Sequence, residues 1–278
     1  MKKFWFVLLA MVLTTGIVFA LGGREAQQPA AQYTIAIGGS TSVNPLMELF
    51  IAEYQKSHSN VKFTVSATGS GDGIKGATEG TYEIGMSSRE LTPAEIGAGL
   101  DALVIAIDGI AVILNNANPV SNLTTDQIKD IYTGKIIRWQ DLGASANGKT
   151  GGIAVISREP GSGTRGAFEE LLKFQDQLVK GAIEFDGTGA IKAEVSRNAD
   201  AIGYISLGSL DNTVKPLNVG GVVPSTANVV SGTYKIARPF ILVTKKSVPL
   251  KAETKAFIDW IMGSAGQAIV KKSWIPVK

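Results

Sequence analysis

The 278-residue sequence contains no cysteine and only one histidine, His58. The missing thiols exclude disulfide bonds, and they also exclude zinc sites built from cysteine and histidine. Charged residues make up 18% of the chain, and the formal net charge is only +3. This small excess gives no indication of a nucleic-acid surface. Because no disulfide bond can form, the stability of the folded protein must come from its hydrophobic cores.

Long hydrophobic runs are also missing after the first twenty residues. Lys2 and Lys3 precede an apolar run over residues 4–13, and Val18-Phe-Ala20 offers the small residues that a signal peptidase reads. We therefore expect residues 1–20 to be a signal peptide and 21–32 to be a flexible leader. The mature protein is expected in the periplasm or another extracytoplasmic space. We expect it to have no transmembrane segment and no lipid anchor, since there is no cysteine to carry one.

Glycine, in contrast, is abundant, with 32 residues, and much of it falls in strand-to-helix turns. Residues 153–156 form a β-branched run that Pro160 and Gly161 end, and Phe168 and Leu171 then follow at helical spacing. Two similar turns come earlier in the chain. Residues 33–37 lead into Gly38-Gly-Ser-Thr-Ser42, and residues 62–66 lead into Ala67-Thr-Gly-Ser-Gly-Asp-Gly-Ile-Lys-Gly76.

Such turns can bind an anion because the first N–H groups of a helix have no partner inside it, and the helix dipole is positive there. Ser162 and Thr164 add hydroxyl donors, and Arg158 adds a planar cation that matches two oxygens of an oxyanion. A capped helix start with a surface arginine explains the turn at Arg158 equally well. The two further copies favour donors that converge on one small anion.

The alternation of short strands and helices predicts an α/β fold with parallel layers. Residues 102–115 and 234–244 are long, β-branched runs that could each cross between two lobes. We therefore expect lobe one to comprise residues 33–112 plus 235–278, and lobe two to comprise residues 113–234. A ligand bound between the lobes would be enclosed when they close.

Motifs along nearly the whole mature chain resemble the periplasmic phosphate-binding proteins that feed ABC-type uptake transporters. The most specific motif is Arg158-Glu-Pro-Gly-Ser-Gly-Thr-Arg165. The others are Gly39-Ser-Thr-Ser-Val43 with Pro45-Leu46, Gly69-Ser-Gly71, Ser87-Ser-Arg89, Asp108-Gly-Ile-Ala-Val112, Thr133-Gly-Lys135 before Trp139, Ala201-Ile-Gly-Tyr204, Arg238-Pro239 and Phe257-Ile-Asp259.

This resemblance implies a type II periplasmic-binding-protein fold with two hinge crossover strands and a ligand cleft between the lobes. It also implies a monomer that binds inorganic phosphate and delivers it to the membrane permease of an ABC importer, with no catalytic residue, cofactor or metal. Carried over from the family, the phosphate contacts are Thr41, Ser42, Ser70, Arg158, Ser162, Gly163 and Thr164.

The chain departs from much of the family just after its third strand. Many members have an aspartate there that accepts the proton of hydrogen phosphate, whereas this chain has Ser88 and Arg89. We expect Asp108 to replace that acceptor, Arg89 to act as a second cation, and Ser88 to line the site. Sulfate would compete if no carboxylate were in reach, because it carries no proton to donate at neutral pH.

Two other functions stay open from the sequence. The chain could be a receptor for sulfate, molybdate or another tetrahedral oxyanion. Less consistent with the sequence is an exported enzyme that hydrolyses phosphate esters. The predicted site contains donors and cations but no nucleophile paired with a base, and His58 lies in a polar helix end.

Overall fold

The computed structural model describes residues 32–277, which belong to one compact unit. The predicted signal peptide and all but the last residue of the predicted leader lie outside the described residues. None of the helices within residues 32–277 is long and apolar enough to cross a membrane.

The main sheet has the strand order β2-β1-β3-β11-β4-β8-β6-β7, with β9 paired to β4. Its strands are β1 (Tyr33–Gly39), β2 (Val61–Ala67), β3 (Ile84–Ser87), β4 (Leu100–Leu114), β6 (Ala154–Arg158), β7 (Ile183–Phe185), β8 (Ala201–Ser206), β9 (Lys215–Pro216) and β11 (Ala237–Lys245). Strands β5 (Asn122–Leu123) and β10 (Asn218–Val219) form a separate small sheet. Pairing is parallel at both ends of the main sheet and antiparallel around β11 and β4.

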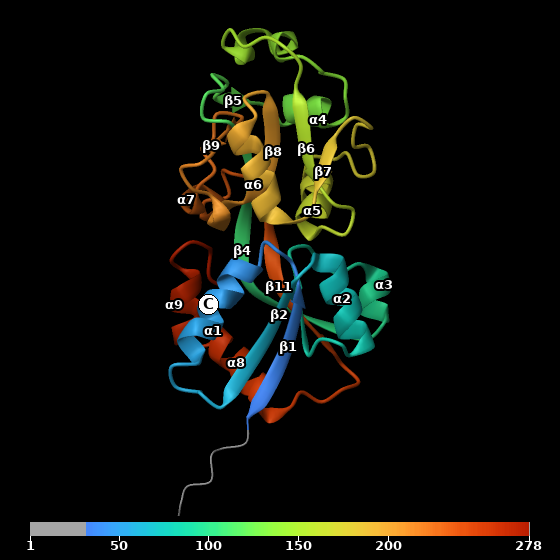
Figure 1. The fold of residues 1–278 in the computed structure, drawn as a ribbon, viewed down its shortest axis with the longest axis vertical. Coiled ribbons are helices and arrows are strands. Elements are labelled where there is room, and N and C mark those ends of the chain that lie inside the picture. The colour runs from blue at the N-terminus through green and yellow to red at the C-terminus, as the bar shows by residue number, and fades with distance from the viewer. Residues whose placement is uncertain (1–31, 278) are drawn as a thin grey trace, which may run out of the picture. The chain divides into compact units, whose positions relative to one another are not determined.

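Helices cover this sheet in two groups (Figure 1). The first group is α1 (Asn44–Tyr54), α2 (Ser70–Glu79), α3 (Pro93–Gly97), α8 (Ala252–Met262) and α9 (Ser264–Val270). The second is α4 (Thr125–Tyr132), α5 (Gly163–Leu171), α6 (Gly187–Arg197) and α7 (Thr226–Val230), with 3-10 helices at Trp139–Ala146 and Leu207–Ser209. The expected α/β fold is confirmed.

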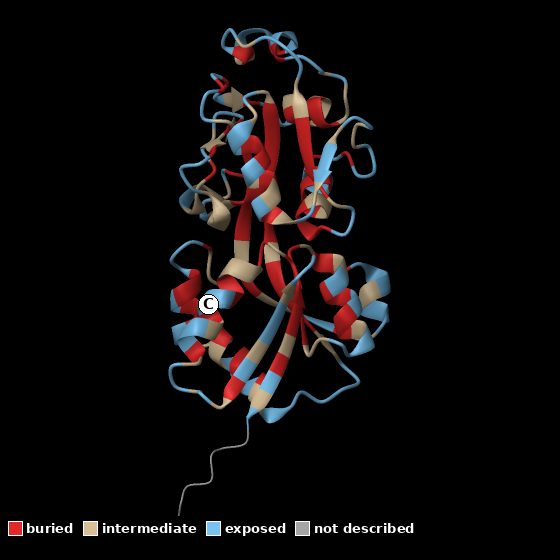
Figure 2. Ribbon diagram, in the orientation of Figure 1, coloured by how far each residue is buried: buried red, intermediate tan, exposed pale blue. Residues whose placement is uncertain are grey.

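Strands β4 and β11 connect the two groups (Figure 1). Ile105 and Ala106 of β4 pack in a hydrophobic cluster with α1 and α8, whereas Ile110 belongs to a cluster around α4 and α5. The chain changes clusters again at β11: Ile236, just before the strand, belongs to the cluster of Ile110, and Phe240 of β11 belongs to that of Ile105. Figure 2 shows both strands largely buried. The two strands therefore form the connection between two lobes, while the exact lobe boundaries at 112/113 and 234/235 remain our proposal.

Local sequence signals explain where several helices begin. Thr124 caps α4 by accepting from the backbone N–H of Gln127, whose side chain in turn accepts from the N–H of Thr124. Pro45 lies in the first turn of α1, where its missing N–H costs nothing. The sequence predicts a helix from about Ala190, but α6 begins three residues earlier, at Gly187. The earlier start places Thr188 in the first turn of α6, and Thr188 takes part in the candidate site.

Candidate functional site

Four helices begin at the junction of the lobes, each of them after a strand. Helices α1 and α2 follow β1 and β2 in lobe one, and α5 and α6 follow β6 and β7 in lobe two. Because the first N–H groups of a helix lack intrahelical acceptors, four positive helix ends are available at this junction. The three turns predicted from the sequence thus meet, and a fourth turn joins them.

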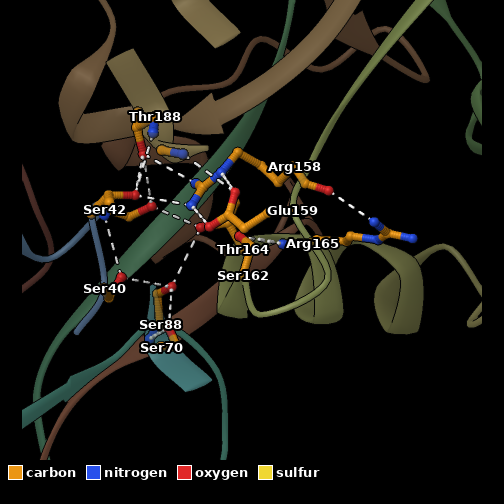
Figure 3. Close-up of polar contacts among 12 residues, drawn as sticks. Ser40, Ser42, Ser70, Ser88, Arg158, Glu159, Ser162, Thr164, Arg165 and Thr188 are labelled. Atoms are coloured by element: carbon orange, nitrogen blue, oxygen red, sulfur yellow. Dashed lines mark hydrogen bonds and ion pairs between the residues drawn. The ribbon is translucent and has the colours of Figure 1, made fainter. Parts of the chain in front are cut away.

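Hydroxyl groups from both lobes form one hydrogen-bonded cluster at this junction (Figure 3). The Oγ1 atom of Thr164 in lobe two lies 2.7 Å from the Oγ atom of Ser42 and 3.3 Å from that of Ser88 in lobe one. The Oγ atom of Ser88 also lies 3.0 Å from Ser40 Oγ and 3.3 Å from Ser70 Oγ. All five side chains are buried. The junction therefore concentrates small hydroxyl groups in a space shielded from water.

Arg158, at the end of β6, is the first cation of the site and is only 2% exposed. Its Nη2 atom donates to Thr41 Oγ1 at 3.0 Å, and its Nη1 atom donates to Thr188 Oγ1 at 3.3 Å. The neighbouring Glu159 binds the same guanidinium through both oxygens, at 2.7 Å from Nε and 2.6 Å from Nη2. This ion pair fixes the direction of the fork and neutralises its charge.

Two side chains hold the backbone of Arg158 in place. The hydroxyl of Tyr204 accepts from the Arg158 N–H at 3.2 Å and lies 2.8 Å from Ser157 Oγ, and burial raises the pKa of Tyr204 to about 12. Arg165 donates to the Arg158 carbonyl at 2.9 Å and pairs with Glu169 and Glu184. Tyr204 and the last residue of the motif, Arg165, thus position the backbone of Arg158.

A second buried arginine comes from the connection between the lobes. Arg238 of β11 is 4% exposed and pairs with Asp108 of β4, directly across the two strands. Its Nη2 atom donates to Thr164 Oγ1 at 3.0 Å, and its Nε atom donates to the Ser88 carbonyl at 3.1 Å. Burial raises the pKa of Asp108, and the Arg238 guanidinium opposes that rise by stabilising the carboxylate.

Asp108 is therefore linked to the hydroxyl cluster through Arg238, which donates to Thr164. Its Oδ1 atom accepts from the Gly208 N–H at 3.2 Å, and its Oδ2 atom accepts from Arg238. Arg89 was expected to be a second cation of the site, but its guanidinium binds a glutamate instead. Its guanidinium binds both oxygens of Glu95, at 2.8 and 2.7 Å, and Arg238 is the arginine that contacts the cluster.

The remaining predicted residues lie at the start of α5. The hydroxyl of Ser162 accepts from the Arg165 N–H at 3.2 Å and so caps the helix. Gly163 lies so close to lobe one that a Cβ atom there would be 2.3 Å from Ser70 Oγ. Nearby, the Gly71 N–H of lobe one donates to the Gly161 carbonyl of lobe two at 3.0 Å. The lobes are thus in direct contact at this point.

One side of the cluster borders a pocket of about 580 Å³, which includes Thr41 and Glu159 in its lining. Asp72 and Asp186 also line this pocket, one from each lobe. The site therefore reaches the surface beside the Arg158 and Glu159 pair.

Sequence reasoning missed four residues that take part in this arrangement: Ser40, Glu159, Thr188 and Arg238. Thr188 could have been found, because Asp186-Gly-Thr-Gly189 after a short strand repeats the glycine and threonine pattern of the other turns. Arg238 belongs to the Arg238-Pro239 motif of the resemblance, but a lone arginine in a strand gives no indication of which residue it faces.

Chemically, this arrangement is suited to holding a small anion rather than to transforming one. It offers hydroxyl donors, helix N-termini and two guanidinium groups within one buried junction. The single histidine lies elsewhere, stacked on Tyr54 with ring centroids 3.8 Å apart. The two carboxylates at the junction, Glu159 and Asp108, are each paired with an arginine rather than with a hydroxyl of the cluster.

Comparison with known proteins supplies the family. A family model described as "PBP superfamily domain" matches residues 24–265. The phosphate-binding protein PstS of Borreliella burgdorferi is 30% identical over 283 residues, covering 98% of this chain and 97% of the relative.

Solved structures agree with this assignment. A protein of Clostridium perfringens, described as a phosphate ABC transporter substrate-binding protein with bound phosphate, shares 45% identity and a TM-score of 0.85. An ABC-type phosphate transport receptor of Vibrio cholerae shares 32% identity and a TM-score of 0.72. Each alignment covers 88% of this chain and 100% of the other. The chain therefore belongs to the PBP superfamily, within the family of the PstS proteins.

Proposed function

We propose that this protein is a receptor that captures inorganic phosphate between its two lobes for an ABC importer. The observation that carries the proposal is the buried junction where Thr41 and Ser42 of the turn after β1 meet Arg158 and Thr164 of the turn after β6. The relatives with 30% identity or more that cover nearly the whole chain are named as phosphate-binding or phosphate-transport proteins.

The proposed site consists of the residues carried over from the family, Ser88, which we expected beside them, and three additions from the geometry. Thr41, Ser42, Ser70 and Ser88 would donate from lobe one. Arg158, Ser162, Gly163 and Thr164 would donate from lobe two, the glycine through its N–H. Thr188 and Ser40 are added because their hydroxyls belong to the same cluster, and Glu159 is added because it orients Arg158.

Selectivity for phosphate requires an acceptor for its proton. Asp108 remains our proposed acceptor, because it is a buried carboxylate that is linked to Thr164 through Arg238. A desolvated carboxylate can accept a hydrogen bond from hydrogen phosphate, but it repels sulfate, which has no proton to donate. Arg89 is not part of this proposal, because its guanidinium donates to Glu95 and to the Glu90 carbonyl, whereas those of Arg158 and Arg238 also donate to hydroxyls at the junction.

Closure of the lobes follows from the division of these contacts. Neither half-site alone supplies all donors, so the anion gains contacts only when the lobes meet. A ligand shifts a conformational equilibrium by its difference in affinity for the two states. Phosphate would therefore favour the closed form, which the permease of the importer would recognise from outside the cytoplasm. We propose a monomer for this role, since each site is built by one chain.

Calorimetric titration of the purified mature protein at neutral pH tests the function. We expect phosphate to bind at a one-to-one ratio, with sulfate and molybdate at least about a hundredfold weaker, as expected for a mismatch of about 3 kcal/mol. Tight binding of sulfate with weak binding of phosphate would assign the protein to another oxyanion. Turnover of an aryl phosphate ester, abolished by Arg158→Ala, would indicate an enzyme instead.

A further inference from the structure

Arg238 has an unusual position for a buried cation, because it stands where both lobes and the connection between them meet. Its strand crosses from one hydrophobic cluster to the other, and its partner Asp108 lies on the other crossing strand in register with it. The Nε atom contacts a backbone carbonyl of lobe one at Ser88, and Nη2 contacts the Thr164 hydroxyl of lobe two.

The Thr164 hydroxyl is the point where the contacts of the cluster converge. Its oxygen lies 2.7 Å from Ser42 Oγ, 3.3 Å from Ser88 Oγ and 3.0 Å from Arg238 Nη2. A hydroxyl has one proton and two lone pairs, so three partners occupy its full capacity. An anion oxygen that binds among these groups must take over some of these contacts, and the guanidinium donor is the strongest of them.

The remaining donors of Arg238 are already in use. Nη1 binds Asp108, and the ring of Phe240 lies 5.0 Å from the centre of the guanidinium. Only Nη2 is directed at the cluster. The side chain is therefore held by its neighbours with one donor presented to the site, which is the arrangement of a preorganised ligand contact.

We propose that Arg238 is a direct contact of the bound anion and that it holds in place Asp108, the carboxylate proposed above as the acceptor that determines selectivity. The proposal rests on the proposed function. In this arrangement, the anion would meet a cation on each side, Arg158 from lobe two and Arg238 from the connection. Each cation has its own carboxylate, so the site accepts an anion without carrying a large excess of positive charge. Arg238 would also link anion binding to the two strands that the lobes turn about.

A paired neutralisation distinguishes this role from a purely structural one. Removing Arg238 alone would leave a buried carboxylate unpaired and could weaken folding for that reason. The double variant Arg238→Met with Asp108→Asn removes both charges, and the asparagine oxygen can still accept from the Gly208 N–H. The matched control is Arg197→Met with Glu194→Gln, which removes an arginine and carboxylate pair on the far end of α6.

Calorimetric titration with phosphate and sulfate is the measurement. We expect the double variant to bind phosphate at least about tenfold more weakly than the wild type, while the control stays within twofold. Asp108→Asn alone should lower the preference for phosphate over sulfate at least about fivefold, because the neutral amide no longer repels an anion that has no proton to donate. Arg238→Lys, which keeps the charge but loses the planar fork, should bind phosphate with an affinity between those of the wild type and the double variant.

The proposal is overturned if the folded double variant and Arg238→Lys both bind phosphate within twofold of the wild type. It is also overturned if Asp108→Asn leaves the preference for phosphate over sulfate unchanged. Failure of the proposed function looks different, because the wild type itself would then not bind phosphate. Circular dichroism and thermal unfolding show whether each variant is folded. If the double variant does not fold, the affinity of Arg238→Lys for phosphate decides the question.

Discussion

The two lobes contribute chemically different halves of the same site. Lobe one supplies neutral hydroxyls on Ser40, Ser42, Ser70 and Ser88, and its nearby arginine is held by a glutamate. Lobe two supplies the Arg158 cation together with hydroxyls on Thr164 and Thr188. The lobe with the cation is suited to capturing an anion, whereas the lobe with the hydroxyls is suited to enclosing it.

This asymmetry also ranks the contacts by energy. A hydrogen bond to a charged group contributes about 1.5–3 kcal/mol, whereas a neutral one contributes about 0.5–1.5 kcal/mol. Substitutions in the cationic half should therefore weaken phosphate binding more than substitutions of single hydroxyls. The variants below test that order.

The largest effect is expected for Arg158→Ala. The substitution removes the cation of lobe two and leaves the Glu159 carboxylate unpaired beside the anion. Phosphate binding should weaken about a hundredfold, and in any case by more than tenfold, by calorimetric titration. Arg197→Ala, at an exposed arginine on α6, is the matched control. An affinity for phosphate within twofold of the wild type would show that Arg158 does not bind the anion.

The next effect is expected for Gly163→Ala, which tests whether the halves must meet. The added Cβ atom would lie 2.3 Å from Ser70 Oγ and 2.9 Å from Ser70 Cβ, closer than packed atoms allow. We expect phosphate affinity to fall about tenfold, and the radius of gyration with phosphate, measured by small-angle scattering, to exceed that of the wild type.

Gly161→Ala is the control for this variant. A Cβ atom at Gly161, in the same loop, would meet no other atom within 4 Å. It should bind phosphate like the wild type. Equal affinities for both alanine variants and the wild type would mean that close contact between Gly163 and Ser70 is not needed for binding.

A smaller effect is expected for Ser70→Ala in lobe one. This variant removes one hydroxyl, which accepts from the Ser88 N–H at 3.1 Å and lies 3.3 Å from Ser88 Oγ. Loss of one neutral hydrogen bond should weaken phosphate binding about two- to tenfold in the same titration. A loss as large as that of Arg158→Ala would contradict the proposed difference between the lobes.

The smallest effect on phosphate binding is expected for Glu95→Gln, which tests Arg89, the arginine of lobe one that binds Glu95. Glu95→Gln keeps the capping contact with Thr92 but removes the charge partner of Arg89. Phosphate affinity should not change, while the free energy of unfolding at pH 7 should fall by about 1 kcal/mol. A tenfold change in phosphate affinity would instead indicate that Arg89 contributes to anion binding.

The pH dependence of that stability difference has a definite sign. The hydrogen bond from Arg89 lowers the pKa of Glu95 below its ordinary value of 4.5. The pair therefore contributes fully above about pH 4.5, and the contribution is lost as the pH falls through the lowered pKa. Denaturant unfolding at pH 7 and at pH 3 should show the wild type and Glu95→Gln converging at the lower pH.

Much of the fold could be predicted from local patterns. The β-branched runs and breakers located β1, β2, β6 and β11, and the capping residue Thr124 located the start of α4. Three of the four turns at the site were predicted because glycine, serine and threonine recur there after strands. These features depend on neighbours in the sequence.

The partners of charged side chains could not be predicted in this way. Arg89 and Arg238 are both arginines near strand ends, yet one binds Glu95 six residues away and the other binds Asp108 across 130 residues. Only the antiparallel pairing of β4 with β11 decides the second case. Thr188 was missed for a simpler reason, since the start of α6 was placed three residues too late.

The most direct test of the account is the crystal structure of this protein with phosphate bound. We predict one anion whose oxygens lie within about 3.2 Å of Arg158 and Thr164 from lobe two and of Ser42 and Ser70 from lobe one. An anion bound to one lobe alone, with the hydroxyls of the other lobe out of reach, would contradict it.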